Sequence, residues 1–172
     1  MMNQIWIPLV LLFSLAPHSA VAQQKTSIVG TWNLISYEDI QDTKTKSKPV
    51  YPWGRHPSGM LIYDDTGHMA VQIQRMPVKR SFAKTETVLT NSDRIDMIAS
   101  YTAYFGTYSV DWQRSTVTHH VTGNLFPFYI GTDQKKTFEL NGDRFILKVS
   151  WVVNGVHWNG IRVFERMRPL DH

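Results

Sequence analysis

The chain has 172 residues, of which 42% are hydrophobic and 19% are charged, and its formal net charge is +4. This positive charge is modest and no nucleic-acid-binding motif accompanies it, so we expect no nucleic-acid partner. The sequence contains no cysteine, which excludes disulfides, a thiolate nucleophile and cysteine-ligated metal sites.

The first residues predict a signal peptide. Residues 5–16 form a mainly apolar run, and Ala20 and Ala22 fit the small-residue pattern that signal peptidase cleaves. We therefore predict a signal peptide over residues 1–22, with cleavage near Ala22, and one domain over residues 23–172. The apolar run is too short to span a bilayer comfortably, but no Lys or Arg precedes it, so a retained anchor is the alternative. We expect a periplasmic or secreted protein, and the lack of disulfides favours a bacterial periplasm.

The rest of the chain reads as strands joined by short turns. Residues 28–38 alternate in polarity, and residues 60–74 read as a hairpin around Gly67, because glycine adopts the positive φ that such a turn requires. Two Asn-Gly pairs, beginning at Asn141 and Asn154, predict further hairpins. Consecutive hairpins avoid open edges best by closing on themselves. The predicted fold is all-β: an antiparallel barrel of about eight strands, with one helix before the fifth strand.

The predicted helix covers residues 92–104. Ile95 and Ile98 follow the 3.6-residue period, and Asn91 or Ser92 can cap the first turn. Residues 75–90 before it have no clear period and predict a long loop. In a compact domain such loops are often functional, so we expect this one to cover the mouth of the barrel.

Several short motifs run through the domain in a fixed order. They are Gly30-Thr31-Trp32, Tyr51-Pro52, Leu61-Ile62-Tyr63, Gly67-His68-Met69, Tyr104-Phe105-Gly106-Thr107-Tyr108, Val117-Thr118-His119-His120-Val121 and Gly131-Thr132-Asp133-Gln134. Together they resemble the lipocalin-like domain family, a group of small calycin-type barrels. The resemblance implies that Gly30 and Trp32 close one end of the barrel and that an arginine of the last strand stacks on the tryptophan. Arg162 and Arg166 are the candidates for this structural role, although Ile161 and Val163 suggest that Arg162 faces outward.

His119 is the main candidate for a functional side chain. Val117, His119 and Val121 form the apolar row of an alternating strand, and an inward histidine must find a hydrogen-bond partner or a ligand. His120 would point to the opposite face, so the two adjacent histidines cannot easily share an ion. We therefore expect no metal, although zinc, iron or haem ligation by His119 or His68 is the alternative.

An enzymatic interpretation is also open. Asp133 would orient His119 as a base, and Tyr108, Tyr63 or Tyr104 would polarise a carbonyl oxygen. Such a set suits an isomerase, cyclase or dehydratase. In the structural interpretation, Asp133 only caps a strand and the tyrosines are core aromatics with satisfied hydroxyls.

We expect the function to be binding of a small hydrophobic or amphipathic molecule, with no cofactor. The expected ligand-contacting residues line the predicted cavity: Leu34, Ser36, Tyr63, Tyr108, His119 and Phe138. A filled barrel acting as an envelope interaction module is the remaining alternative. The sequence defines neither the ligand nor the oligomeric state.

Overall fold

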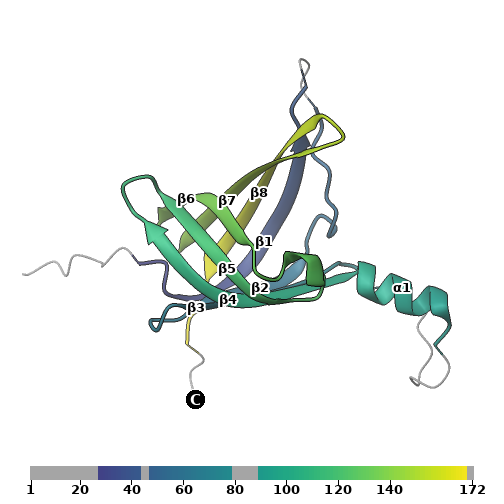
Figure 1. Ribbon diagram of the computed structural model, residues 1–172, viewed down its shortest axis with the longest axis horizontal. Coiled ribbons are helices and arrows are strands. Elements are labelled where there is room, and N and C mark those ends of the chain that lie inside the picture. The colour runs from purple at the N-terminus through teal and green to yellow at the C-terminus, as the bar shows by residue number, and fades with distance from the viewer. Residues whose placement is uncertain (1–26, 44–46, 79–88, 170–172) are drawn as a thin grey trace, which may run out of the picture.

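The computed structural model describes residues 27–43, 47–78 and 89–169, which form a closed antiparallel barrel (Figure 1). Each strand pairs with the next along the chain, and the first pairs with the last. The strands are β1 (Gly30–Gln41), β2 (Ser58–Tyr63), β3 (His68–Gln74), β4 (Tyr101–Asp111), β5 (Thr116–Asn124), β6 (Asp133–Asn141), β7 (Arg144–Val153) and β8 (Val156–Arg166). The predicted signal peptide and most of the predicted cover loop lie outside the described residues. Within the part of the chain that is described, no helix is long and apolar enough to cross a membrane.

The two ends of the barrel are built differently. At one end, which we call the hairpin end, tight turns join β2 to β3, β4 to β5 and β6 to β7. At the other end, which we call the mouth, the connections from β1 to β2 and from β3 to β4 are long. The short 3₁₀ helix η2 (Pro127–Tyr129) also lies at the mouth, between β5 and β6. Because adjacent strands run antiparallel, every interior side chain can be placed near one end or the other from its position in its strand.

The helix is shorter than predicted and comes before the fourth strand, not the fifth. Helix α1 (Asn91–Ala99) begins with a reciprocal capping pair in which Thr90, not Asn91 or Ser92, is the N-cap and bonds Asp93. Residues 101–104, predicted as helix, are the start of β4, where Tyr104 pairs with Val71 of β3. Pairing with a neighbouring strand outweighed the local helical period there.

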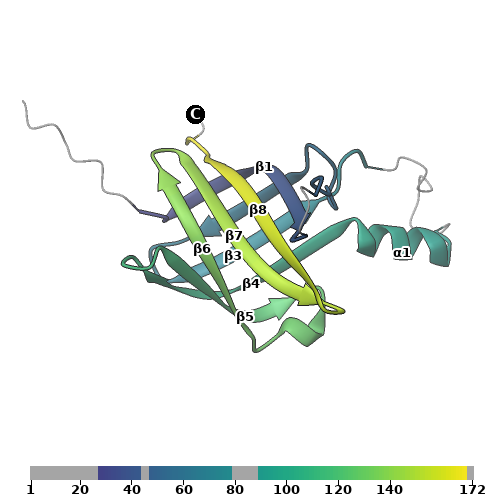
Figure 2. The ribbon, with the colours of Figure 1, turned by 90° about the horizontal axis from the view of Figure 1, so that it is seen from above.

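Helix α1 makes little contact with the barrel. It has no buried residue, and Ile95 is 67% exposed. Figures 1 and 2 both show α1 extending away from the strands. The apolar period that predicted this helix therefore does not mark a face packed on the core.

A β-bulge in β1 changes which of its side chains face inward. Leu34 pairs with Phe164, but the next paired residue is Ser36, so the register against β8 shifts by one. Beyond the bulge, Tyr37 pairs with the inward Arg162, and Ser36 shares the opposite face with Val163. A single extra residue exchanges the two faces of a strand. The structure therefore places Ser36 on the outer row, away from the interior where it was predicted.

Candidate functional site

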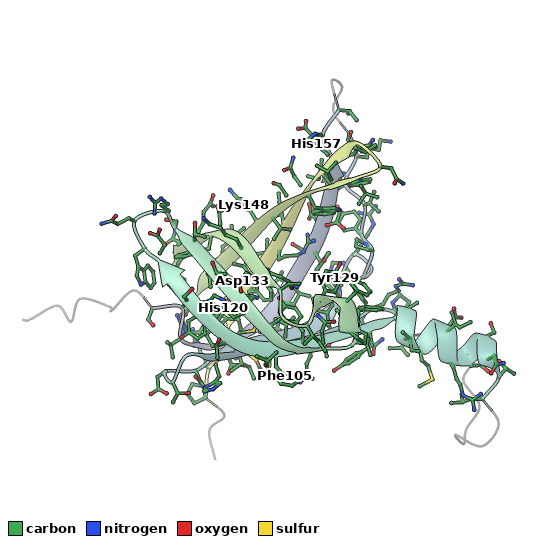
Figure 3. All side chains as sticks on the ribbon, in the orientation of Figure 1. Phe105, His120, Tyr129, Asp133, Lys148 and His157 are labelled. Atoms are coloured by element: carbon green, nitrogen blue, oxygen red, sulfur yellow. The ribbon has the colours of Figure 1, made fainter. Side chains whose placement is uncertain are left out.

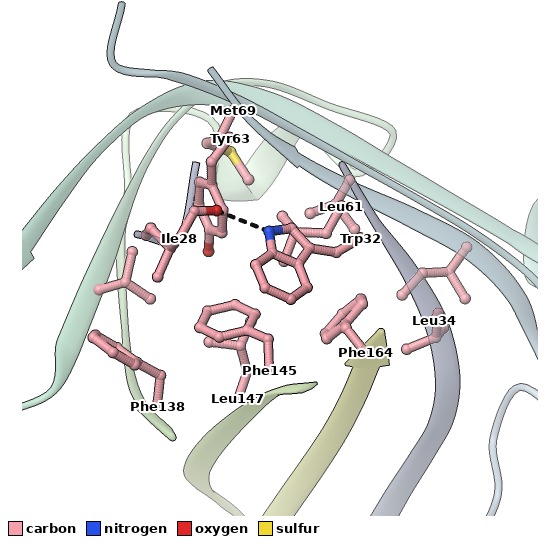
Figure 4. Close-up of a cluster of buried hydrophobic side chains, with 13 residues drawn as sticks. Ile28, Trp32, Leu34, Leu61, Tyr63, Met69, Phe138, Phe145, Leu147 and Phe164 are labelled. Carbon is pink, nitrogen blue, oxygen red and sulfur yellow. Dashed lines mark hydrogen bonds between the residues drawn. The ribbon is translucent and has the colours of Figure 1, made fainter. Parts of the chain in front are cut away.

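Trp32 and Arg166 close the hairpin end of the barrel. Trp32 is fully buried, and its Nε1 donates to the Ile28 carbonyl at 2.8 Å (Figure 4). The Arg166 guanidinium carbon lies 4.1 Å from the centre of the indole ring. Arg166 also donates to the Val29 carbonyl at 2.7 Å, which ties the chain before β1 across this end. The group is structural, because the cation stacks on the ring and the contacts of Arg166 among the described residues are all made within the barrel.

Of the two arginines that the sequence left open, Arg166 stacks on Trp32 and Arg162 does not. Gly30 makes room for the stack, since a Cβ there would meet Arg166 Nη1 at 2.6 Å, and its φ is +138°. Arg162 is buried and points into the barrel, where its guanidinium lies over the Tyr37 ring. The prediction that Arg162 stacks on Trp32 is therefore wrong. The expectation that Arg162 faces outward is also wrong.

The hairpin half of the interior is filled by apolar side chains. Figure 4 shows ten of them by name, including Phe145 against Trp32, whose ring centres are 5.1 Å apart. Three predicted ligand contacts, Leu34, Tyr63 and Phe138, belong to this packed cluster and are at most 6% exposed. A ligand entering from the mouth meets other side chains before it reaches them.

His119 lies on the mouth side of the apolar cluster, and its ring is hydrogen-bonded to two tyrosine hydroxyls. Its Nε2 is 2.6 Å from Tyr63 Oη, and its Nδ1 is 2.9 Å from Tyr104 Oη. The residue is fully buried, and this burial, aided by the positive charges of Lys136 and His120, holds the pKa of the imidazole well below its usual value. His119 is therefore neutral at physiological pH. Both of its ring nitrogens are engaged in hydrogen bonds, which leaves no free nitrogen for a metal.

The neutral imidazole sets the direction of these hydrogen bonds. One of its ring nitrogens donates and the other accepts, so one tyrosine must donate to it and the other must accept. Neither tyrosine has another hydrogen-bond partner among the described residues, so one hydroxyl hydrogen stays without an acceptor in either tautomer. Tyr63 is buried and Tyr104 is only partly buried, so we assign the tautomer in which Tyr63 donates to Nε2 and the unpaired hydrogen belongs to Tyr104. Nδ1–H then donates to Tyr104 Oη. The hydroxyl hydrogen of Tyr104, on the more open side, is left to donate to another acceptor.

The predicted pairing of His119 with Asp133 is wrong. In the register of β5 and β6, His119 is opposite Gln134, whereas His120 is opposite Asp133. Asp133 Oδ1 lies 2.7 Å from His120 Nδ1, and Figure 3 shows both residues on the outer face of these strands. Tyr108 is also separate, because its hydroxyl donates to the Asp64 carbonyl at 2.7 Å. The proposed catalytic set of His119, Asp133 and Tyr108 is therefore not assembled.

Lys136 brings into the interior an amine that was not predicted from the sequence. In β6 the inward row is Gln134, Lys136, Phe138 and Leu140, running from the mouth toward the hairpin end. The Nζ atom lies 3.2 Å from Gln134 Oε1 and 5.9 Å from the centre of the Tyr104 ring. Among the described residues, no carboxylate forms an ion pair with it. Burial, followed by repulsion from Arg162, lowers the pKa of Lys136 to about 7.

Arg162 and Asp39 form an internal ion pair beside this amine. Arg162 Nη2 is 2.8 Å from Asp39 Oδ1, and Nη1 donates to the Glu38 carbonyl at 2.6 Å. The guanidinium also lies over the Tyr37 ring. Gly160 leaves space for it, since a Cβ there would meet the guanidinium at 2.6 Å. Burial raises the pKa of Asp39, and the nearby arginine opposes this shift.

Aromatic side chains surround the mouth. Trp151 and Trp158 face each other across the β7–β8 pair as nearly parallel rings, 6.3 Å between centres. Trp158 shares its row with the inward Arg162, so the stack continues the interior surface outward. Tyr37 and Trp53 make an edge-on contact with centres 6.1 Å apart. The mouth thus offers half-buried rings, and the interior below it offers hydrogen-bond donors.

The sequence carried a signal for Lys136. Phe138 and Leu140 mark the inward row of this strand, and alternation places Lys136 in the same row. The register agrees, because Gln134 of that row pairs with the buried His119. Among the described residues, no three His, Asp or Glu side chains are arranged to hold a metal ion.

A comparison with protein families matches the lipocalin-like domain over residues 29–166. The chain belongs to the lipocalin-like domain family. No curated protein matches this lipocalin-like chain. Eight-stranded barrels of this kind have an interior that side chains fill or that holds one small ligand, so the fold suits small-molecule binding in general.

Proposed function

We propose that this lipocalin-like protein binds a small amphipathic molecule, which enters at the mouth with its polar group first. The observation that carries the proposal is the Lys136 amine, which lies inside the barrel with no carboxylate ion-pair partner among the described residues. The amine is partly buried and donates only to Gln134 among the described residues, so a ligand acceptor would complete its hydrogen bonds.

The polar group of the ligand is a hydrogen-bond acceptor. Lys136 presents an amine, and Tyr104 has a hydroxyl hydrogen to donate once His119 occupies its oxygen. Arg162 is already paired with Asp39, so it adds positive potential rather than a free donor. A carbonyl, carboxylate or hydroxyl oxygen satisfies these groups, whereas a cationic group would be repelled.

The apolar part of the ligand lies toward the mouth. The hairpin end is filled by the packed cluster and closed by Trp32 and Arg166. The aromatic rings of Trp151, Trp158 and Tyr104 therefore provide the apolar surface that a ligand reaches first. Small-molecule sites commonly combine aromatic walls with a few placed polar groups.

We also propose that the protein is exported. The apolar run of residues 5–16 and the small residues at Ala20 and Ala22 support a cleaved leader. Intact mass of the protein recovered from the periplasm or medium tests this, with the mature chain expected to begin near Gln23. A full-length chain retained in the membrane fraction would instead support the uncleaved anchor.

Tryptophan side-chain NMR tests the binding proposal without knowledge of the natural ligand. Titration with 1-octanol should shift the indole N–H signals of Trp151 and Trp158 and leave Trp32 unchanged. Tyr104→Phe should weaken this binding roughly threefold to tenfold, as expected for the loss of one hydrogen bond. The matched control is Tyr101→Phe, since Tyr101 lies on the outer row of β4 and its hydroxyl donates to Gln72 Oε1 there. The absence of any indole shift at saturating 1-octanol would contradict the proposal.

A further inference from the structure

We propose that Lys136 captures the carbonyl group of an aldehyde or an unhindered ketone as a reversible imine. The inference deepens the proposed function and rests on it, because it names the chemical class of the ligand that the interior would hold. The site consists of the Lys136 amine, the Tyr104 side chain beside it and the aromatic mouth above.

The position of Lys136 differs from that of the neighbouring lysines. Lys135 is on the outer row of the same strand and is exposed, and Lys148 forms an ion pair with Glu139 on the outside. Lys136 alone of these three faces the interior. Among the described residues its Nζ donates to the Gln134 amide oxygen and, weakly, to the Gln134 carbonyl, and it lies beside the Tyr104 ring. No carboxylate among the described residues holds its proton by an ion pair.

The groups around Lys136 favour the neutral amine. Burial is the first cause, and the positive Arg162 on β8 adds to it, so the pKa of the amine falls to about 7. Of the other charged or titratable groups facing this region, Asp39 on β1 is paired with Arg162, while His119 on β5 and Tyr104 on β4 are uncharged at neutral pH. Near pH 7 a substantial fraction of the molecules therefore carries a neutral, nucleophilic amine at Lys136, whereas an ordinary lysine is almost entirely protonated.

The reaction needs no other reagent. The nitrogen lone pair attacks the carbonyl carbon, the C=O π electrons move to oxygen, and a proton passes from nitrogen to that oxygen to give a carbinolamine. Loss of this hydroxyl group with the second nitrogen proton releases one water and leaves the C=N bond. The Tyr104 ring centre lies 5.9 Å from Nζ, and its hydroxyl is held through His119 by Tyr63. This hydroxyl would donate to the carbonyl oxygen as charge develops on it.

The surroundings define the rest of the ligand. Phe138 is the next inward residue below Lys136, and the stacked Trp151 and Trp158 lie toward the mouth. An apolar chain extending from the imine toward these rings stays out of water. A charged or strongly hydrated carbonyl compound such as a sugar lacks this match, so the ligand is an apolar aldehyde or ketone.

The test is trapping with octanal and cyanoborohydride, read by intact mass and tandem mass spectrometry. We expect one octyl group per protein, located at Lys136, with a labelling rate that rises between pH 6 and pH 8. Lys136→Arg keeps the positive charge but forms no stable imine, so it should lose this label. Lys135→Arg is the matched control and should be labelled like the wild type. Excess 1-octanol should slow labelling by competition.

The possible outcomes separate the imine from binding itself. Octyl groups spread over surface lysines, with the same yield in Lys136→Arg, would overturn the proposal. If 1-octanol shifts the Trp158 indole signal but octanal leaves no label on Lys136, the imine is refuted and non-covalent binding stands. If neither compound interacts with the barrel, both the imine and the proposed function are refuted.

Discussion

The buried His119 predicts a specific loss of stability in acid. Its folded-state pKa is held well below 6.5 by burial, so the unfolded chain takes up a proton on this ring that the folded chain does not. Below about pH 6.5 the unfolded state therefore binds more protons, and the free energy of unfolding falls as the pH falls. If the folded ring stays neutral, the loss between pH 7 and pH 5 is about 2 kcal/mol from this one residue, from proton linkage with the reference pKa.

The assay is urea unfolding at pH 7, 6 and 5 for the wild type and His119→Gln. Glutamine removes the titrating ring but keeps a donor and an acceptor, so the variant should be less stable at pH 7 and lose about 2 kcal/mol less on acidification. All other titrating groups are common to the two proteins and largely cancel. Parallel stability curves for the two proteins would refute the reasoning, because they would mean that His119 is protonated in the folded state. As a second measurement, the ring signals of His119 in the wild type should not move over this pH range.

Three further substitutions test the framework. Gly30→Ala should lower the free energy of unfolding by roughly 1–3 kcal/mol more than Gly67→Ala. Both glycines have positive φ, but only at Gly30 would a Cβ clash, with a guanidinium nitrogen of Arg166. Equal losses in thermal unfolding would contradict this. Arg162→Met should lower the free energy of unfolding by several kcal/mol, because it leaves the Asp39 carboxylate inside the barrel without its cation. Adding Asp39→Asn should recover part of that loss. Strictly additive effects in a double-mutant cycle would argue against the ion pair. Ile98→Gln should change the unfolding free energy by less than about 0.5 kcal/mol, because α1 buries nothing; a large loss would show that the helix packs on the barrel.

The barrel was predictable because its signals are local. Alternating strands and Asn-Gly turns define hairpins, and at Asn154-Gly155 both residues adopt the positive φ that this turn type needs. The inward direction of His119 and the outward direction of His120 also followed from alternation, and both are confirmed.

The interior polar groups were harder to predict because they depend on pairing between distant strands. The β1 bulge moved Ser36 outward and turned Tyr37 and Asp39 inward, and no local pattern announces it. Arg162 was misplaced because its neighbours Ile161 and Val163 are apolar, yet they lie on the outer row, where Val163 is still buried. The inward position of Arg162 is fixed by an ion pair with Asp39, far away in the sequence.

The site predictions likewise succeeded where the signal was local and failed where it depended on pairing between strands. His119 was identified, but its partners were not, because Tyr63 and Tyr104 reach it from two other strands. Asp133 was placed with the wrong histidine by one step of register. Lys136 was missed because a lysine is usually exposed, although it shares the inward row with Phe138 and Leu140. A contact at Leu34, Tyr63, Tyr108 or Phe138 stays a prediction that a bound ligand would test.

The direct test of binding at the mouth is an NOE measurement on the complex with ¹³C-labelled 1-octanol. We expect the CH₂OH protons to contact the Tyr104 ring and the terminal methyl to contact Trp151 or Trp158, which places the polar group inward. Two results would contradict this account of the site. The ligand could show contacts only with exposed residues of α1, or it could bind in the reverse direction, with its hydroxyl group at Trp158.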